Sequence, residues 1–128
     1  MQEAINVVDL EKSFSDHKVL DKISFHVPTG SIFALLGTNG SGKTTTVKMM
    51  TTLLKPDNGY ITIDGMNVLE QSLKVQKEFS LTGQFAAVDE VLTGRENLVL
   101  IAKLRHMKNY TEKVDELLTE FDLQEAAD

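Results

Sequence analysis

The chain has 128 residues, of which 41% are hydrophobic and 25% are charged, and its formal net charge is −6. These values are ordinary for one soluble domain with a hydrophobic core, and the absence of cysteine excludes disulfides and thiolate metal sites. Residues 111–128 hold seven acidic residues and one lysine, which accounts for the whole charge imbalance. A nucleic-acid binder would be expected to show a basic face, and the sequence indicates none. No apolar run is long enough to span a bilayer, and the first residues lack the pattern of a signal peptide.

Residues 1–36 predict strands and no helix. Residues 4–10 are mostly apolar and predict a first strand, and residues 18–27 place most of their apolar side chains on one face, with a break near Asp21 and Lys22. This pattern predicts a half-buried antiparallel strand or hairpin. After a turn at residues 28–30, the almost unbroken apolar run of residues 31–36 predicts a buried strand.

The run from Gly37 to Thr44 fits the phosphate-binding pattern G-x-x-x-x-G-K-[ST]. Glycines let the main chain approach phosphates closely, and successive N–H groups can point into one concavity at the start of the next helix. We expect Lys43 to contact the β- and γ-phosphates, the hydroxyl of Thr44 to hold Mg²⁺ and Thr45 to reach a phosphate oxygen. The β-branched run 44–46 is a poor start for a helix, which favours ligand roles for its hydroxyls.

The residues predicted to bind the nucleotide in this loop are Gly37, Thr38, Asn39, Gly40, Ser41, Gly42, Lys43, Thr44 and Thr45. The alternative is a chance glycine turn. A predicted strand before the loop and a predicted helix after it favour the nucleotide site over that alternative.

After the loop, the sequence predicts a helix that is followed by further strands. Val47, Met50 and Leu54 fall at helical spacing, and residues 55–59 are a strong signal for a stop and a turn. Residues 60–63 alternate and end at Asp64-Gly65, which is typical of a hairpin turn. Residues 70–78 predict a helix, and residues 79–82 a short buried strand that ends at residues 83–84.

The second half predicts two helices. Thr93 and Glu96 form a capping-box pattern at the start of a helix that runs to about Met107, with an apolar face at residues 98, 101 and 102. A second helix begins near Tyr110 and places residues 114, 117, 118 and 121 on one face.

This order of elements and these motifs resemble the nucleotide-binding domain of an ATP-binding cassette (ABC) transporter, from about Ile5 to the last residue. Residues 80–98 resemble most the multidrug or antibiotic-resistance exporters of that family. The resemblance implies an α/β P-loop NTPase fold of the ABC ATPase type, present in part as one incomplete domain over residues 1–128. The expected parts are an antiparallel β-subdomain (about 1–30 and 59–70), a RecA-like P-loop core (about 31–58 and 71–84) and the start of a helical subdomain (about 85–128).

Two further site residues follow from the resemblance. Gln84 sits where the family has its Q-loop glutamine, which implies a catalytic residue whose amide oxygen reaches Mg²⁺ or the attacking water. Phe14 sits where the family places an aromatic residue that stacks on adenine. From the residues alone, Gln84 could be an exposed loop residue, and Phe14 could be a core residue beside Val19.

The other polar residues are weaker candidates for functional roles. Asp64 ends a strand as a Walker B aspartate does, but alternation before it and the glycine after it favour a turn residue over a metal ligand. Three histidines, which form no ligand pair at i, i+4, are interpreted as surface or packing residues: His17, His26 and His106. The family's signature motif, Walker B aspartate, catalytic glutamate and switch histidine are expected beyond Asp128.

The resemblance therefore implies a subunit that binds ATP and Mg²⁺ and powers export of a small molecule such as a drug. It implies a transmembrane permease and a second nucleotide-binding subunit as partners, with no nucleic acid and no membrane span of its own. The expected location is cytoplasmic, at the inner face of the cell membrane. We expect binding without significant hydrolysis by this chain alone. A non-catalytic nucleotide-binding module and a small P-loop kinase remain the alternatives.

Overall fold

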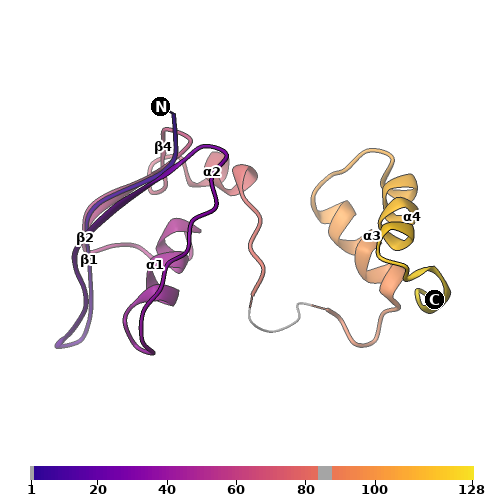
Figure 1. Cartoon of the computed structure of the whole chain (residues 1–128), viewed down its shortest axis with the longest axis horizontal. Coiled ribbons are helices and arrows are strands. Elements are labelled where there is room, and N and C mark those ends of the chain that lie inside the picture. The colour runs from indigo at the N-terminus through magenta and orange to yellow at the C-terminus, as the bar shows by residue number, and fades with distance from the viewer. Residues whose placement is uncertain (1, 84–87) are drawn as a thin grey trace. The chain divides into compact units, whose positions relative to one another are not determined.

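A computed structural model describes residues 2–83 and 88–128. The chain divides into two compact units, Met1–Leu81 and Thr82–Asp128 (Figure 1). Each unit has its own cluster of buried apolar side chains. The first unit carries the described strands and the P-loop, and the second is helical. The three-part domain layout expected from the sequence stays a prediction.

The first unit consists of a small antiparallel sheet and two helices. Its elements are β1 (Glu3–Phe14), β2 (His17–Pro28), α1 (Lys43–Met50), β3 (Asn58–Ile63), β4 (Met66–Asn67) and α2 (Ser72–Glu78). The strand order is β2-β1-β3-β4, and every neighbouring pair is antiparallel. The sheet confirms the predicted strands at residues 4–10, 18–27 and 60–63, and α2 confirms the predicted helix.

The β1–β2 hairpin has the predicted break. Leu10 faces Ile23 but Lys12 faces Leu20, so the register shifts across Asp21 and Lys22, and Lys22 has a φ of 50°. An extra residue of this kind bends and twists a strand pair. The hairpin therefore curves along its length (Figure 1).

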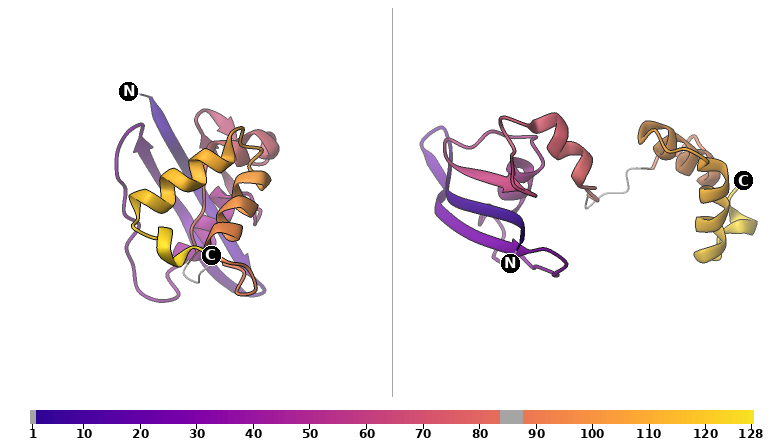
Figure 2. Two further views of the ribbon diagram at one scale, coloured as in Figure 1. Left: turned by 90° about the vertical axis from the view of Figure 1, so that its right-hand side faces the viewer. Right: turned by 90° about the horizontal axis from the view of Figure 1, so that it is seen from above.

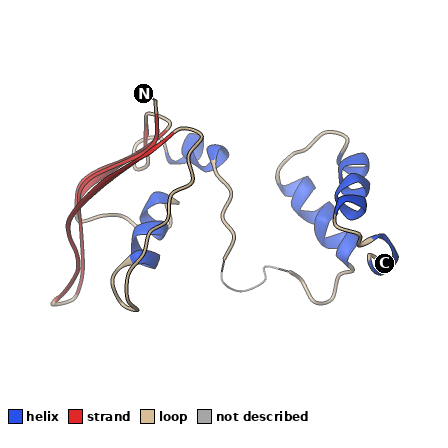
Figure 3. Cartoon of the chain, viewed as in Figure 1, coloured by secondary structure: helices blue, strands red, loops and turns tan. Residues whose placement is uncertain are grey.

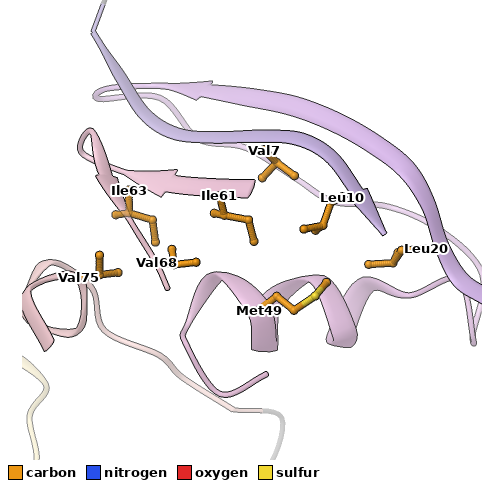
Figure 4. Close-up of a cluster of buried hydrophobic side chains, with 8 residues drawn as sticks. All are labelled: Val7, Leu10, Leu20, Met49, Ile61, Ile63, Val68 and Val75. Atoms are coloured by element: carbon orange, nitrogen blue, oxygen red, sulfur yellow. The ribbon is translucent and has the colours of Figure 1, made fainter. Parts of the chain in front are cut away.

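The core of the first unit lies between one face of the sheet and the two helices (Figure 4). Eight buried side chains form it: Val7, Leu10, Leu20, Met49, Ile61, Ile63, Val68 and Val75. The fully buried side chains of α1 are Thr46 and Met49, while Met50 and Leu54 of the predicted spacing are partly buried and pack against the same core. Burial of this face holds α1, and the loop before it, against the sheet.

Helix α1 also ends earlier than the apolar spacing indicated. The N–H of Leu53 donates to the carbonyl of Lys48 at 2.8 Å, and that of Thr52 to Met49 at 3.2 Å, with Thr52 at a φ of 64°. This pair of bonds is a Schellman motif, which closes a helix by turning its last N–H groups back onto its carbonyls. Leu54 therefore lies outside the helix.

Two predicted strands are wrong. Residues 31–36 and 79–82 are loop in the structure, and Figure 3 shows the first of them as the coil between β2 and α1. A strand needs a hydrogen-bonded neighbour, and none of the described strands pairs with either run. Ile32 and Leu36 are exposed, and Phe33 stacks on Phe25 with ring centroids 5.2 Å apart. Apolar composition predicted buried strands at both runs, but it does not reveal whether a neighbouring strand is there to pair with. Phe79 packs against the core of the first unit without forming a strand.

The second unit is a pair of packed helices, α3 (Gly94–Leu104) and α4 (Tyr110–Glu120), followed by a short 3₁₀ helix at Gln124–Ala126 (Figure 2). The capping box is confirmed: the N–H of Thr93 donates to Glu96 Oε2 at 2.8 Å, and the N–H of Glu96 donates to Thr93 Oγ1 at 3.2 Å. Val114 and Leu118 are buried as predicted, but Phe121 is exposed.

Helix α3 stops at Leu104 rather than near Met107. The N–H of Met107 donates to the carbonyl of Ala102 at 3.0 Å, and His106 takes a φ of 52°, so a Schellman motif ends the helix there. Arg95 ties the start of α3 to the last residues, through its N–H to Ala127 and its side chain to Asp128, and its side chain also pairs with Asp115 of α4.

Candidate nucleotide-binding site

The P-loop, residues 37–44, ends at a glycine that a larger residue could not replace without rearrangement of the neighbouring strand. Gly42 has a φ of 85° and immediately precedes α1. A Cβ at this position would overlap the end of the Leu20 side chain and would lie 3.2 Å from the Val19 carbonyl. The last glycine of the loop is therefore pressed against β2, so the sheet fixes where the phosphate-binding loop ends and the helix begins.

The ammonium group of Lys43 lies across the loop. Its Nζ donates to the carbonyl oxygens of Gly37 at 2.6 Å and Thr38 at 2.7 Å, and it lies 3.4 Å from Ser41 Oγ. Among residues 2–83 and 88–128, no acidic side chain forms an ion pair with it. The loop thus presents an ammonium group that is held by main-chain carbonyls and whose charge no carboxylate neutralises.

The first turn of α1 adds main-chain donors. The first helical bond runs from the N–H of Thr46 to the carbonyl of Gly42, at 2.8 Å, so the N–H groups of residues 43–45 have no acceptor within the helix. The positive end of the helix dipole adds to this field. Together with Lys43, these donors fit a polyphosphate and no cationic ligand.

The three threonines of this turn separate into two roles. Thr44 is exposed and Thr45 is half-buried, so both hydroxyls can reach a ligand. Thr46 is buried, and its hydroxyl donates to the carbonyl of Gly42 at 2.9 Å. The expected ligand role for the third hydroxyl is therefore wrong, because this group stabilises the start of the helix instead.

Phe14 is the last residue of β1, where the hairpin turns, and its side chain is 48% exposed. It does not belong to the buried core, so the alternative of a core residue beside Val19 is wrong. The Nζ of Lys12 lies over the ring, 5.6 Å from its centroid. Stacking of Phe14 on adenine stays a prediction.

Lys12 also binds Asp57, a contact that the sequence did not indicate. Its Nζ lies 2.6 Å from Asp57 Oδ1, and the N–H of Ser13 donates to Asp57 Oδ2 at 2.7 Å. The hydrogen bond from Lys12, followed by the one from Ser13, lowers the pKa of the Asp57 carboxyl below its ordinary value. The signal was limited to the turn composition around Asp57, which does not reveal a partner 45 residues away.

The remaining candidates lie elsewhere or are not described. Gln84 falls outside the described residues, and its catalytic and Mg²⁺ roles stay predictions. Asp64 and Gly65 form a tight hairpin turn with φ values of 47° and 76°, as expected of a turn residue. Within the described residues, no group of three or more histidine, aspartate or glutamate side chains could hold a metal ion.

A glycine loop closed by a lysine and followed by a helix defines a P-loop nucleotide-binding protein. The family model described as ABC transporter matches residues 20–128. This chain therefore belongs to the ABC transporter family, in its ATP-binding part.

Curated relatives match nearly the whole of this chain. The chain is 41% identical over 127 residues to the daunorubicin resistance ATP-binding protein DrrA2 of Streptomyces coeruleorubidus, which covers 98% of this chain and 39% of the relative. It is 39% identical to the daunorubicin/doxorubicin resistance ATP-binding protein DrrA of Streptomyces peucetius, over 98% of this chain and 38% of that protein. The chain thus spans about two fifths of the length of these relatives.

A solved structure described as an ATP-binding subunit of an ABC transporter superimposes with a TM-score of 0.83 at 30% identity. The match covers 97% of this chain and 52% of that one. It confirms the predicted α/β fold of the ABC ATPase type, present in part. None of the described helices has the length and apolar character needed to cross a bilayer.

Proposed function

We propose that this chain binds ATP with Mg²⁺ through its P-loop and belongs to the ATP-binding subunit of an ABC exporter. The observation that carries the proposal is the Lys43 ammonium group, held at the loop by two carbonyls beside the uncapped N–H groups of α1. A triphosphate would replace those carbonyls as the partner of Lys43. Drug-resistance names among the relatives support export, and the intact transporter would move a small molecule.

Each loop residue has a proposed task. Main-chain N–H groups of Gly37–Thr45, with the side chain of Lys43, would hold the phosphates, and the hydroxyl of Thr44 would hold Mg²⁺. When bound, Mg²⁺ supplies positive charge that neutralises the phosphate oxygens during phosphoryl transfer. Gln84 would orient the metal or the water, and Phe14 would stack on the adenine.

The proposed partners are those of an ABC ATPase: a transmembrane permease and a second ATP-binding subunit, with this chain on the cytoplasmic side of the membrane. We expect the 128-residue chain to bind ATP with little turnover. The catalytic carboxylate that the family resemblance implies matches no residue among these 128. No specific observation favours a small P-loop kinase.

Isothermal titration of the chain with ATP and Mg²⁺ tests the site. Lys43→Ala is expected to abolish measurable binding, because it removes the ammonium group from the loop. Lys48→Ala is the matched control, since it removes the same charge from an exposed position of the same helix. Equal affinity of the Lys43→Ala and unsubstituted chains would refute the site. Release of phosphate, measured in the same samples, reports turnover separately.

A further inference from the structure

The end of β1 that carries Phe14 extends past its neighbour in the sheet. The last pair between β1 and β3 is Glu11 with Asn58, whereas β1 continues to Phe14. Residues 12–14 are therefore paired with β2 on one side, and no strand among the described residues pairs with them on the other. Such an edge presents unpaired main-chain groups and is free to fray, so something else must hold it if Phe14 is to keep one position.

Asp57 takes the place of the missing strand. Its N–H donates to the carbonyl of Glu11 at 2.9 Å, and its two carboxylate oxygens accept from the Ser13 N–H and the Lys12 ammonium. One residue of the loop between α1 and β3 thus binds three consecutive residues of β1. Charge-assisted hydrogen bonds of this kind are stronger than those between neutral groups.

Lys12 passes this constraint to the aromatic ring. Residues 12 and 14 of a strand point to the same face of the sheet. Lys12 is only 13% exposed, held between Asp57 and the ring, while Phe14 is half exposed. The ammonium group lies over one face of the ring, so the ring is attracted to it and offers its other face to a ligand.

The ring is also near the phosphate-binding loop. Lys12 faces Leu20 across the hairpin, and Leu20 is the residue against which Gly42 is pressed. The turn of the β1–β2 hairpin and the P-loop lie at the same end of the first unit in Figure 1. A base attached to a triphosphate in the loop would therefore meet this end of the sheet.

We propose that Lys12 and Asp57 are positioning residues that hold the Phe14 ring for the base of the bound nucleotide. This inference rests on the proposed function, since it assigns the base-binding half of the same site. Neither residue contacts the phosphates in this scheme. Their removal should weaken the part of the affinity that comes from the base and leave the part that comes from the phosphates.

The test compares ATP with inorganic tripolyphosphate, both with Mg²⁺, by calorimetry on the full chain. Lys12→Met keeps the length of the side chain and removes the charge, and it should raise the Kd for ATP about three- to tenfold while the Kd for tripolyphosphate stays within about twofold. Asp57→Asn should have the same selective effect. Lys12→Arg keeps a cation over the ring and should retain most of the ATP affinity.

Two further variants give the effect of losing the ring itself and the effect of losing an unrelated charge. Phe14→Leu should raise the Kd for ATP about tenfold or more without affecting tripolyphosphate, and adding Lys12→Met to it should cause little further loss. Lys18→Met removes the same charge from the same hairpin, where Lys18 pairs with Glu11 and Asp21, and should leave the preference for ATP unchanged.

The outcomes separate the two claims. Equal weakening of both ligands in Lys12→Met, or additive losses with Phe14→Leu, would show a general effect on charge or folding and overturn the positioning role. Unchanged ATP affinity in both Lys12→Met and Asp57→Asn would overturn it as well, with the proposed function intact. Absence of ATP binding by the unsubstituted chain would refute the proposed function and this inference with it. Circular dichroism of each variant identifies losses that come from unfolding.

Discussion

Replacing Gly59 by alanine adds one methyl group but should strongly lower the unfolding free energy of the first unit. Gly59 lies in β3 with a φ of 80°, opposite the register shift in β1 between Val8 and Glu11. A Cβ there would lie well under 3.0 Å from the carbonyl oxygens of Val8 and Asp9, which are main-chain atoms of the neighbouring strand β1. The two strands would have to separate to admit one methyl group.

The magnitude follows from two contributions. A left-handed conformation costs an alanine about 1 kcal/mol more than a glycine, and forcing a methyl group into packed main chain adds roughly 1–3 kcal/mol. Gly65 is the matched control, because its φ is 76° and a Cβ there would meet nothing within 4 Å. We expect a loss of about 3 kcal/mol for Gly59→Ala and about 1 kcal/mol for Gly65→Ala.

Thermal unfolding followed by circular dichroism measures the difference. In a unit of this size, each kcal/mol lowers the Tm by roughly 4–8 °C, so the two variants should be separated by at least that amount. If Gly59→Ala were no less stable than Gly65→Ala, the close approach of β3 to the main chain of β1 would be wrong, and the argument from strand separation would fail.

Three other predictions test separate parts of the structure. His106→Gly should stabilise the helical unit by about 0.5–1 kcal/mol in chemical denaturation, because glycine accepts the left-handed conformation that ends α3. Because Lys12 lowers the pKa of Asp57, their contact stabilises the fold fully above the ordinary carboxyl pKa of about 4. This stabilisation is lost as the pH falls through the lower pKa of the folded state. Asp57→Asn should therefore make the unfolding free energy depend less on pH in this acid range. Replacing exposed Ile32 and Leu36 together by lysine should reduce self-association in light scattering with an unchanged Tm; a lower Tm would mean that these side chains are packed.

Local patterns predicted much of the fold because they act over short distances. The capping box at Thr93, the turn at Asp64-Gly65 and the break in the hairpin each depend on residues a few positions apart, and each is confirmed. The P-loop is likewise a local motif, and its glycine geometry and Lys43 were predicted as a unit.

The predictions that failed depend on distant parts of the chain or on residues that rarely end a helix. Apolar composition at residues 31–36 and 79–82 indicates burial but does not reveal whether a neighbouring strand exists to pair with. The ends of α1 and α3 were placed too late because Thr52 and His106, which adopt the left-handed conformation, are not residues that usually end a helix. The contact between Lys12 and Asp57 depends on tertiary structure, so no pattern in the sequence could predict it.

Local sequence motifs and tertiary contacts both contribute to the candidate site. The proposed phosphate half is a continuous segment of one loop and one helix turn, so its sequence pattern is sufficient to recognise it. The proposed base half is assembled from β1 and the loop before β3, where Lys12 contacts both the Asp57 carboxylate and the Phe14 ring. A stacking ring needs only to present its face, so many side-chain arrangements can hold it. The structure of this chain is therefore what identifies Lys12 and Asp57 as the pair to test.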